Sequence, residues 1–346
     1  MIRVLVVDDS ALLRKIIRDI LSSDPGIEVV DTAANGQLAV SKVRELKPDI
    51  VTLDVDMPVM DGFTALKKIM AETPCPVIML SGLTQAGANL TFKCLEAGAV
   101  DYFPKPIVQG PHGLQELAAE LIAKVRGIYA HRRIRAVRPP ASRPVALAAA
   151  ISLAPAQVAD RVVAIGISTG GPAALAQIFP QLPETFPPVL VVQHMPKEFT
   201  GAFAERLNKL TKLRVKEAQS GDPVEPGLVL VAPGDHHLVL QKKNGGTVAA
   251  LLHSDKVDGH RPSASVLFKS VAEHYRERAI GVIMTGMGRD GVDGLKEMRA
   301  AGAKTVGQDQ ATSVVYGMPG IAAKEQVLDH VEPLDGIIGR LGRLLQ

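Results

Sequence analysis

The chain alternates short apolar runs with longer stretches in which apolar residues recur every three or four positions. Runs rich in Val, Ile and Leu predict buried strands, and the longer spacing predicts amphipathic helices. In the first third of the chain the predicted strands are residues 3–9, 29–33, 50–55, 77–81 and 101–105. The predicted helices between them are residues 10–23, 35–46, 62–72 and 86–98. Five successive strand–helix units predict a doubly wound α/β domain, with helices covering both faces of a parallel sheet.

The second half of the chain repeats this style. Its predicted strands are residues 161–168, 189–195, 228–234, 279–287 and 304–309, and its predicted helices are 172–179, 202–209, 263–275, 291–300 and 319–324. Residues 237–252 predict a hairpin that turns at Asn244-Gly245 or at Gly245-Gly246. We therefore expect a second, Rossmann-like domain with a mostly parallel sheet and the antiparallel hairpin at its edge.

Residues 128–160 separate the two patterns and show neither periodicity. They are rich in Arg, Pro and Ala, which predicts a linker, although the basic start could also be a nucleic-acid arm. The predicted domains are thus 1–127 and 161–346, with the linker at 128–160. A chain of 346 residues is long enough for two domains of ordinary size.

Composition narrows the function classes. Lys and Arg (39) exceed Asp and Glu (36) by only +3, and aromatic residues are 3% with no Trp, so a nucleic-acid binder is not expected. Two cysteines suit a reducing compartment and exclude a Cys-rich zinc site. No segment resembles a signal peptide, and no apolar run is long enough to insert in a membrane. We expect a soluble, cytoplasmic monomer.

Acidic side chains follow two strands of the first predicted sheet. Asp8 and Asp9 end the first strand and Asp54 ends the third, so three carboxylates converge at one edge. Their mutual repulsion would be offset by a hard divalent cation, for which Mg²⁺ is the expected cofactor. Ser81 and Lys105 end the fourth and fifth strands. This set of groups suits a carboxylate that accepts a phosphoryl group.

The segments DD, LDVDMPVMDG, MLSGLT and DYFPKP resemble the receiver domain of two-component response regulators over residues 1–127. The resemblance implies a flavodoxin-like fold and a histidine kinase as phosphodonor. It implies that Asp54 is the phosphoacceptor and that Asp8, Asp9 and the carbonyl of Asp56 hold Mg²⁺. It also implies switch roles for Ser81, Tyr102 and Lys105.

In the second domain, Gly166-Ile167-Ser168-Thr169-Gly170 follows a predicted strand and precedes a predicted helix. Gly-x-Ser-x-Gly in a strand–turn–helix is the pattern of a nucleophile elbow, with the N–H of Thr169 facing the oxyanion. A structural Ser N-cap is the alternative. Nucleophilic Ser requires a base, and His194 ends the next strand along the chain.

The base and its orienting partner leave alternatives open. His260, in the polar loop DGHRPS, is the strongest rival to His194; His236, His237 and His253 are weaker. Asp290 follows another buried strand and is the expected partner of the imidazole, whereas Asp293 lies about one helical turn further on.

Gly286, Gly288 and Gly291 also form G-x-G-x-x-G after a strand, with Asp309 as a candidate ribose ligand. A dinucleotide-dependent enzyme is therefore the alternative function. It leaves too little chain for a full dinucleotide domain and gives Ser168 no role. A non-catalytic interaction domain is a further alternative.

The segments GISTGGPAAL, VQHMPKEFTGAFAERL, GHRPSASVLF and MTGMGRDGVDGLKEMRAAGAKTVGQDQATSVVYGMP resemble the catalytic domain of chemotaxis protein-glutamate methylesterases. The resemblance implies a Ser168–His194–Asp290 triad, with Thr169 and the Met287 backbone near the oxyanion and no cofactor for the esterase. It implies hydrolysis of glutamyl methyl esters on methyl-accepting chemotaxis receptors, deamidation of receptor glutamines, and activation by phosphorylation. Two departures, Ala264-Ser265 and Asp56, are expected not to touch the triad or the phosphoacceptor.

Overall fold

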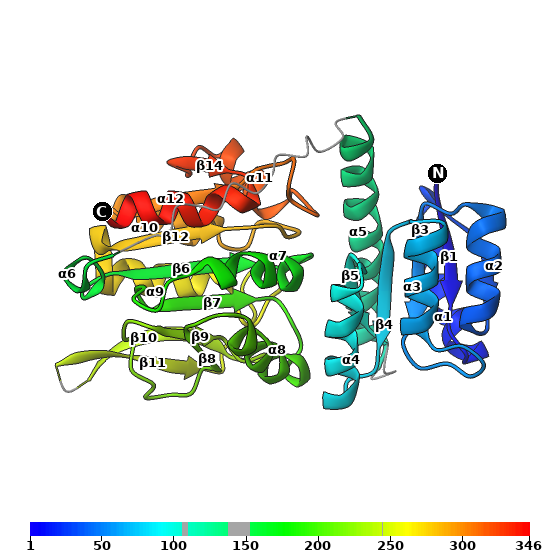
Figure 1. Ribbon diagram of the computed structural model, residues 1–346, viewed down its shortest axis with the longest axis horizontal. Coiled ribbons are helices and arrows are strands. Elements are labelled where there is room, and N and C mark those ends of the chain that lie inside the picture. The colour runs from blue at the N-terminus through cyan, green and yellow to red at the C-terminus, as the bar shows by residue number, and fades with distance from the viewer. Residues whose placement is uncertain (106–109, 138–152, 244) are drawn as a thin grey trace. The chain divides into compact units, whose positions relative to one another are not determined.

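The computed structural model describes residues 1–105, 110–137, 153–243 and 245–346 (Figure 1). The chain divides into two compact units, Met1–Arg133 and Ile134–Gln346. Helix α5 (Gly110–Val137) continues into the first ten residues of the predicted linker, and residues 138–152 of that linker lie outside the described residues. The domain boundaries at 127 and 160 therefore stay a prediction.

The first unit is a five-stranded parallel sheet with strand order β2-β1-β3-β4-β5, as predicted. Its strands are β1 (Ile2–Val7), β2 (Ile27–Ala33), β3 (Ile50–Asp54), β4 (Val77–Ser81) and β5 (Asp101–Pro104). Its other helices are α1 (Ala11–Ser22), α2 (Gly36–Leu46), α3 (Gly62–Glu72) and α4 (Gln85–Glu96). The strand order reverses between β1 and β3, and ligands of such sheets bind beyond the strand ends at this point.

Each of helices α1 to α4 begins with a polar side chain that caps its first turn. The capping oxygen accepts a hydrogen bond from the backbone N–H three residues later, which satisfies a donor that the helix itself cannot pair. The four capping residues are Ser10, Asn35, Asp61 and Thr84. These caps begin each helix close to the carboxyl edge of the sheet.

The second unit contains a seven-stranded parallel sheet with the order β14-β13-β12-β6-β7-β9-β8. Its strands are β6 (Val162–Ile167), β7 (Val189–Gln193), β8 (Arg214–Glu217), β9 (Leu228–Val231), β12 (Ala279–Ile283), β13 (Lys304–Gln308) and β14 (His330–Glu332). Its helices are α6 (Pro155–Val158), α7 (Gly171–Ile178), α8 (Lys197–Leu210), α9 (Ala264–Tyr275), α10 (Val292–Ala300), α11 (Met318–Lys324) and α12 (Ile337–Leu345). Strand order reverses between β6 and β12, which lie side by side in Figure 1.

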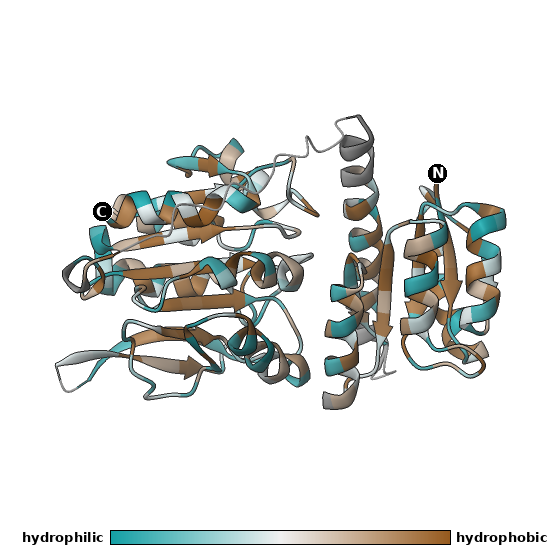
Figure 2. Cartoon of the chain, in the orientation of Figure 1, coloured by the Kyte–Doolittle hydropathy of each residue, from teal (hydrophilic) through white to brown (hydrophobic). Residues whose placement is uncertain are grey.

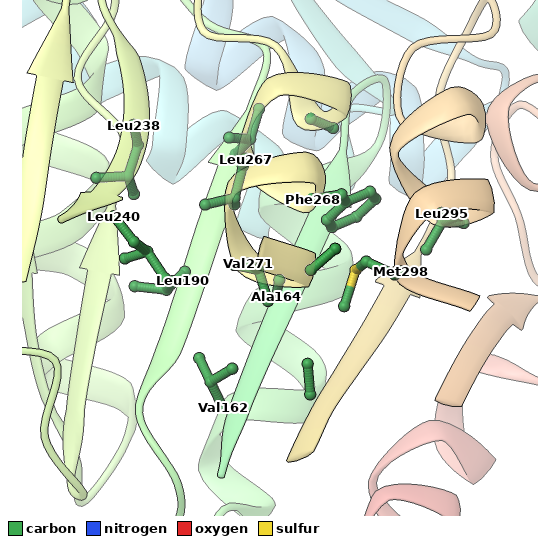
Figure 3. Close-up of a cluster of buried hydrophobic side chains, with 14 of the residues drawn as sticks. Val162, Ala164, Leu190, Leu238, Leu240, Leu267, Phe268, Val271, Leu295 and Met298 are labelled. Carbon is green, nitrogen blue, oxygen red and sulfur yellow. The ribbon is translucent and has the colours of Figure 1, made fainter. Parts of the chain in front are cut away.

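The predicted hairpin is antiparallel, but it forms a two-stranded sheet of its own instead of the edge of the large sheet. Its strands are β10 (His237–Lys243) and β11 (Gly246–Leu252), and Lys243 pairs with Gly246, which excludes a turn at Gly245-Gly246. Asn244 of the other predicted turn lies outside the described residues. Leu238 and Leu240 belong to the buried cluster that α9 forms over the large sheet (Figure 3). Packing of this apolar face against α9 takes the place of edge pairing.

Hydropathy follows the layers, since the strands are mostly hydrophobic and the helices carry both kinds of residue (Figure 2). Two edge strands, β8 and β14, were absent from the prediction because Arg214–Glu217 and His330–Glu332 are short and polar. Among the described residues, no helix is both long and apolar enough to cross a bilayer.

Candidate active and phosphorylation sites

The first candidate site lies at the carboxyl ends of β1 and β3. One carboxylate oxygen each from Asp8, Asp9 and Asp54 lies within 4.8 Å of the others. Asp8 and Asp54 are buried and Asp9 is exposed. Three converging hard oxygen donors fit a divalent cation such as Mg²⁺, which would neutralise their charge and that of an incoming phosphate.

Lys105 follows β5 and reaches both buried carboxylates. Its Nζ lies 2.7 Å from Asp54 Oδ2 and 3.2 Å from Asp8 Oδ2. The pKa of Asp54 is raised to about 6: burial is the largest cause, the charge of Asp8 adds to it, and Lys105 opposes both effects. Burial alone would lower the pKa of Lys105, but its hydrogen bond and charge interaction with Asp54 raise it.

The other predicted receiver residues lie around this cluster. Ser81 is buried at the end of β4, where its hydroxyl lies 2.7 Å from the hydroxyl of Thr91. The backbone N–H of Asp56 donates a 3.3 Å hydrogen bond to Asp54 Oδ1, so the expectation that Asp56 would not touch Asp54 is wrong. Tyr102 is buried in β5, and burial raises the pKa of its hydroxyl above its usual range.

The second candidate site lies beyond the ends of β6, β7 and β12, three adjacent strands. Ser168 follows β6, and α7 begins three residues later at Gly171. Gly170 has φ = 77°, and a Cβ there would lie 2.6 Å from Val314. The turn therefore needs Gly at this position, as a sharp strand-to-helix elbow does.

His194 and Asp290 meet beside this elbow. His194 Nε2 lies 2.7 Å from Asp290 Oδ2, and the backbone N–H of His194 donates to the carbonyl of Ile167. His194 Nδ1 is buried and has no hydrogen-bond partner among the described residues. Ser168 Oγ makes no hydrogen bond to it, and such bonds are often long in the absence of substrate.

Asp290 is almost fully surrounded by donors. Besides His194, its carboxylate accepts from Ser263 Oγ and from three backbone N–H groups, those of Ala264, Ser265 and Gly291. Burial would raise its pKa, but the hydrogen bonds, led by that from His194, hold the pKa well below its usual range. Asp290 is therefore ionised, so Nε2 of His194 carries the proton and Nδ1 is the free acceptor.

The expectation that Ala264-Ser265 would not touch the triad is wrong, because both backbone N–H groups donate to Asp290. This contact arises because Asp290 lies at the N-terminus of α9, where unpaired backbone donors are available. Asp293 instead pairs with Arg289 and Lys296, away from His194.

Of the rival histidines, His260 contacts His194 directly. Its ring stacks on that of His194 with centroids 3.7 Å apart and planes 10° apart. His237 is buried, accepts from Ser263 N–H and lies 3.0 Å from the carbonyl of Asp255, which is a structural arrangement. Asp290 bonds to His194, which favours His194 as the base.

Two comparisons with known proteins bear on this arrangement. Residues 163–341 match the family described as CheB methylesterase, and residues 4–117 match the response regulator receiver domain. The chain belongs to the CheB methylesterase family. It is 46% identical to a Sulfurimonas denitrificans protein named protein-glutamate methylesterase/protein-glutamine glutaminase, over 99% of this chain and 98% of the relative. A protein of the same name from Pyrococcus abyssi is 45% identical over 97% of this chain and 91% of the relative.

A solved structure agrees for the second unit. The CheB methylesterase catalytic domain of Thermotoga maritima matches with a TM-score of 0.53 and 42% identity, covering 54% of this chain and all of that one. Membership of the CheB family confirms the family expected from the sequence motifs. The prediction of two parallel-sheet α/β domains is confirmed as well.

The dinucleotide alternative is not favoured, because packing accounts for Gly286 and a left-handed backbone, with φ of 78° and 92°, accounts for Gly288 and Gly291. A Cβ on Gly286 would lie 2.3 Å from Met318 Sδ and 2.7 Å from Ser168 Cβ. Asp309, the candidate ribose ligand, accepts from the N–H and hydroxyl of Thr312. Gly286 thus brings the 286–287 turn against Ser168 in this CheB-family chain.

Four buried polar residues that support the site are marked by no sequence motif. Gln193 and Thr285 donate to the carbonyls of Ser168 and Thr169, Gln308 accepts from the N–H of Thr285, and Ser263 donates to Asp290. Gln193 and Gln308 each end a mostly buried strand, β7 and β13. A lone amide side chain at the end of a buried strand was the available signal, because buried amides require partners.

Proposed function

We propose that this chain is a serine hydrolase that removes methyl groups from glutamyl methyl esters of methyl-accepting chemotaxis receptors and deamidates receptor glutamines. The observation that carries this proposal is the 2.7 Å pairing of His194 with the ionised Asp290 beside the Ser168 elbow. Family membership and the names of the relatives support the substrate class. Such receptor segments are cytoplasmic, so the proposal includes a cytoplasmic location.

In the proposed acylation step, Ser168 Oγ attacks the ester carbonyl carbon while His194 Nδ1 takes the hydroxyl proton. The C–O bond to the methoxy group then breaks, and His194 returns the proton so that methanol leaves. Asp290 keeps Nε2 protonated and stabilises the imidazolium that forms. Backbone N–H groups of Thr169 and Met287 would bind the oxyanion, and neither donates to a described residue.

Deacylation runs the same steps with water. His194 removes a proton from water as the oxygen attacks the acyl carbon, and the proton then passes to Ser168 Oγ as the C–O bond breaks. A glutamine substrate loses ammonia instead of methanol and yields the same glutamate. None of these steps requires a cofactor.

Methanol release from methylated receptor, compared with Ser168→Ala, tests the proposal. The variant should lose activity by at least about 10³-fold while keeping its fold. Labelling of Ser168 by a serine-directed phosphonate separates a hydrolase from a non-catalytic interaction domain. Methanol release at the wild-type rate by Ser168→Ala would exclude this mechanism.

We further propose that phosphorylation of Asp54 activates the esterase and that a chemotaxis histidine kinase is the phosphodonor. Asp8, Asp9 and Asp54, with the carbonyl of Asp56, would hold Mg²⁺, whose chemistry is charge neutralisation at the phosphoryl group. Lys105 lies 2.7 Å from Asp54 and would hold a phosphate oxygen, as would Ser81. Tyr102, in β5, would respond to the phosphorylation of Asp54.

Two measurements test regulation. The modified residue after treatment with a small phosphodonor should be Asp54, and not Asp56 or Asp61, with no reaction after Mg²⁺ is chelated. The fragment 162–346 should be more active than the unphosphorylated full chain if the receiver inhibits the esterase. Equal activity would exclude inhibition, and label on Asp56 would refute the assigned phosphoacceptor.

A further inference from the structure

The elbow presents two peptide groups whose carbonyls are each held by two donors. The carbonyl of Ser168 accepts from Gln193 Nε2 at 3.0 Å and from Gly171 N–H at 2.8 Å. The carbonyl of Gly286 accepts from the backbone N–H groups of Gly317 and Met318. In a trans peptide the N–H points opposite to the C=O, so each anchored carbonyl fixes the direction of the next N–H.

The two N–H groups oriented in this way are those of Thr169 and Met287. Neither donates a hydrogen bond to any described residue, although both lie in the loops that meet at Ser168. The Met287 N–H is oriented by backbone donors alone. The Thr169 N–H is oriented by one backbone donor, the N–H of Gly171, and by one side chain, that of Gln193.

Burial and hydrogen bonds fix the Gln193 side chain in this position. It is 2% exposed, and its Nε2 also donates to the carbonyl of His194 at 3.1 Å. Both atoms that contact Nε2 are carbonyl oxygens, which only accept hydrogen bonds, so the NH₂ end of the Gln193 amide must face them. Its Oε1 is buried without a hydrogen-bond partner and would lie 1.9 Å from a Cβ on Gly171, so Gly171 leaves the room that the amide needs.

We propose that Gln193 is a positioning residue for the esterase reaction. It ties the strand end that carries the nucleophile to the strand end that carries the base, and it aims the Thr169 N–H at the oxyanion. The inference rests on the proposed hydrolase function. An interaction that forms only with the oxyanion affects kcat and leaves KM unchanged.

The test uses the full chain with Gln193→Met, which keeps the length of the side chain but cannot donate. We expect kcat for glutamyl methyl ester hydrolysis to fall about 10- to 100-fold while KM stays within about twofold, since loss of an oxyanion donor costs up to about 10³-fold. Asn208→Leu is the matched control, because Asn208 anchors the N–H of Val215 through its amide, away from the site. It should keep the wild-type kcat.

A second readout separates positioning from general damage. A thiono ester places sulfur, a poor acceptor, where the oxyanion forms, so the wild-type preference for the oxygen ester should collapse in Gln193→Met. An equal loss on both esters, or an unchanged kcat, would overturn the proposal.

Gln193→Glu, of the same size, is used if Gln193→Met does not fold; failure of both to fold would reject a positioning role in favour of a structural one. Absence of methanol release and of phosphonate labelling in the wild type would instead refute the proposed function.

Discussion

Replacement of Asp54 by Asn should stabilise the first unit while it abolishes phosphorylation. The side chain is 1% exposed, and burial raises the pKa of Asp54 from 3.8 to about 6. An ionised carboxylate at this position therefore destabilises the folded state by about 3 kcal/mol. Asn keeps the volume and removes the charge, but it also weakens the interaction with Lys105, so we expect a net gain of about 1–3 kcal/mol without metal.

The pH dependence has a definite sign. Between pH 3.8 and about 6 the folded state binds more protons at Asp54 than the unfolded chain does, so stability falls as pH rises through this window. The advantage of Asp54→Asn should be absent near pH 4 and complete above about pH 6.5. Mg²⁺ should stabilise the wild type and have little effect on the variant.

Hydrogen exchange of the β1 and β3 amides, followed across urea concentrations in EDTA, measures this stability within the full chain. Asp31→Asn is the matched control: its carboxylate pairs with Lys42 at 2.7 Å and has a lowered pKa, so its loss should not stabilise. A gain for Asp54→Asn that is equal at pH 4 and pH 7.5, or no gain at either, would refute the assignment of the destabilisation to a buried charge.

Three further predictions concern single residues. Asp290→Asn should lower kcat by about 10⁴-fold, because an amide favours the wrong His194 tautomer, and a loss under tenfold would contradict the triad. His194→Ala should reduce kcat by at least about 10³-fold and His260→Ala by no more than about tenfold; the reverse order would make His260 the base. Val59 is 86% exposed and, although β-branched, has a left-handed backbone with φ = 69°. Val59→Gly should therefore stabilise the first unit by about 1 kcal/mol in the same exchange assay. A loss of stability would show that Val59 is not strained.

The positions of the chemical groups followed from the strand pattern. Parallel strands end at one edge, so finding where each apolar run stops was enough to bring Asp8 near Asp54 and His194 near Asp290. The hydrogen bonds that orient these groups could not be found in this way. Gln193 bonds two carbonyls that no sequence pattern marks, and Ser263 reaches Asp290 only because α9 begins beside it.

The prediction of secondary structure was wrong where the sequence signals within one segment favoured different structures. The segment before Val137 combines Arg and Ala, which favour helices, with a charge run typical of a linker, and helix α5 continues through it. The hairpin alternation was read correctly, but alternation gives no information on which surface the apolar face packs against. The hairpin's apolar face packs against α9, which is a tertiary contact. Because of this contact β10 and β11 form a sheet separate from the large one.

The aspartates of the two proposed sites, Asp290 and Asp54, show how different environments suit the same side chain to different roles. Asp290 accepts from Ser263, His194 and three backbone N–H groups, so it stays ionised and bonded throughout the proposed reaction. Asp54 is equally buried but receives one 3.3 Å backbone hydrogen bond and the Lys105 contact, and its pKa rises to about 6. A carboxylate with few donors is stabilised less and is the better candidate to bond to phosphorus. Opposite pKa shifts at two strand ends thus match an orienting group and a nucleophile.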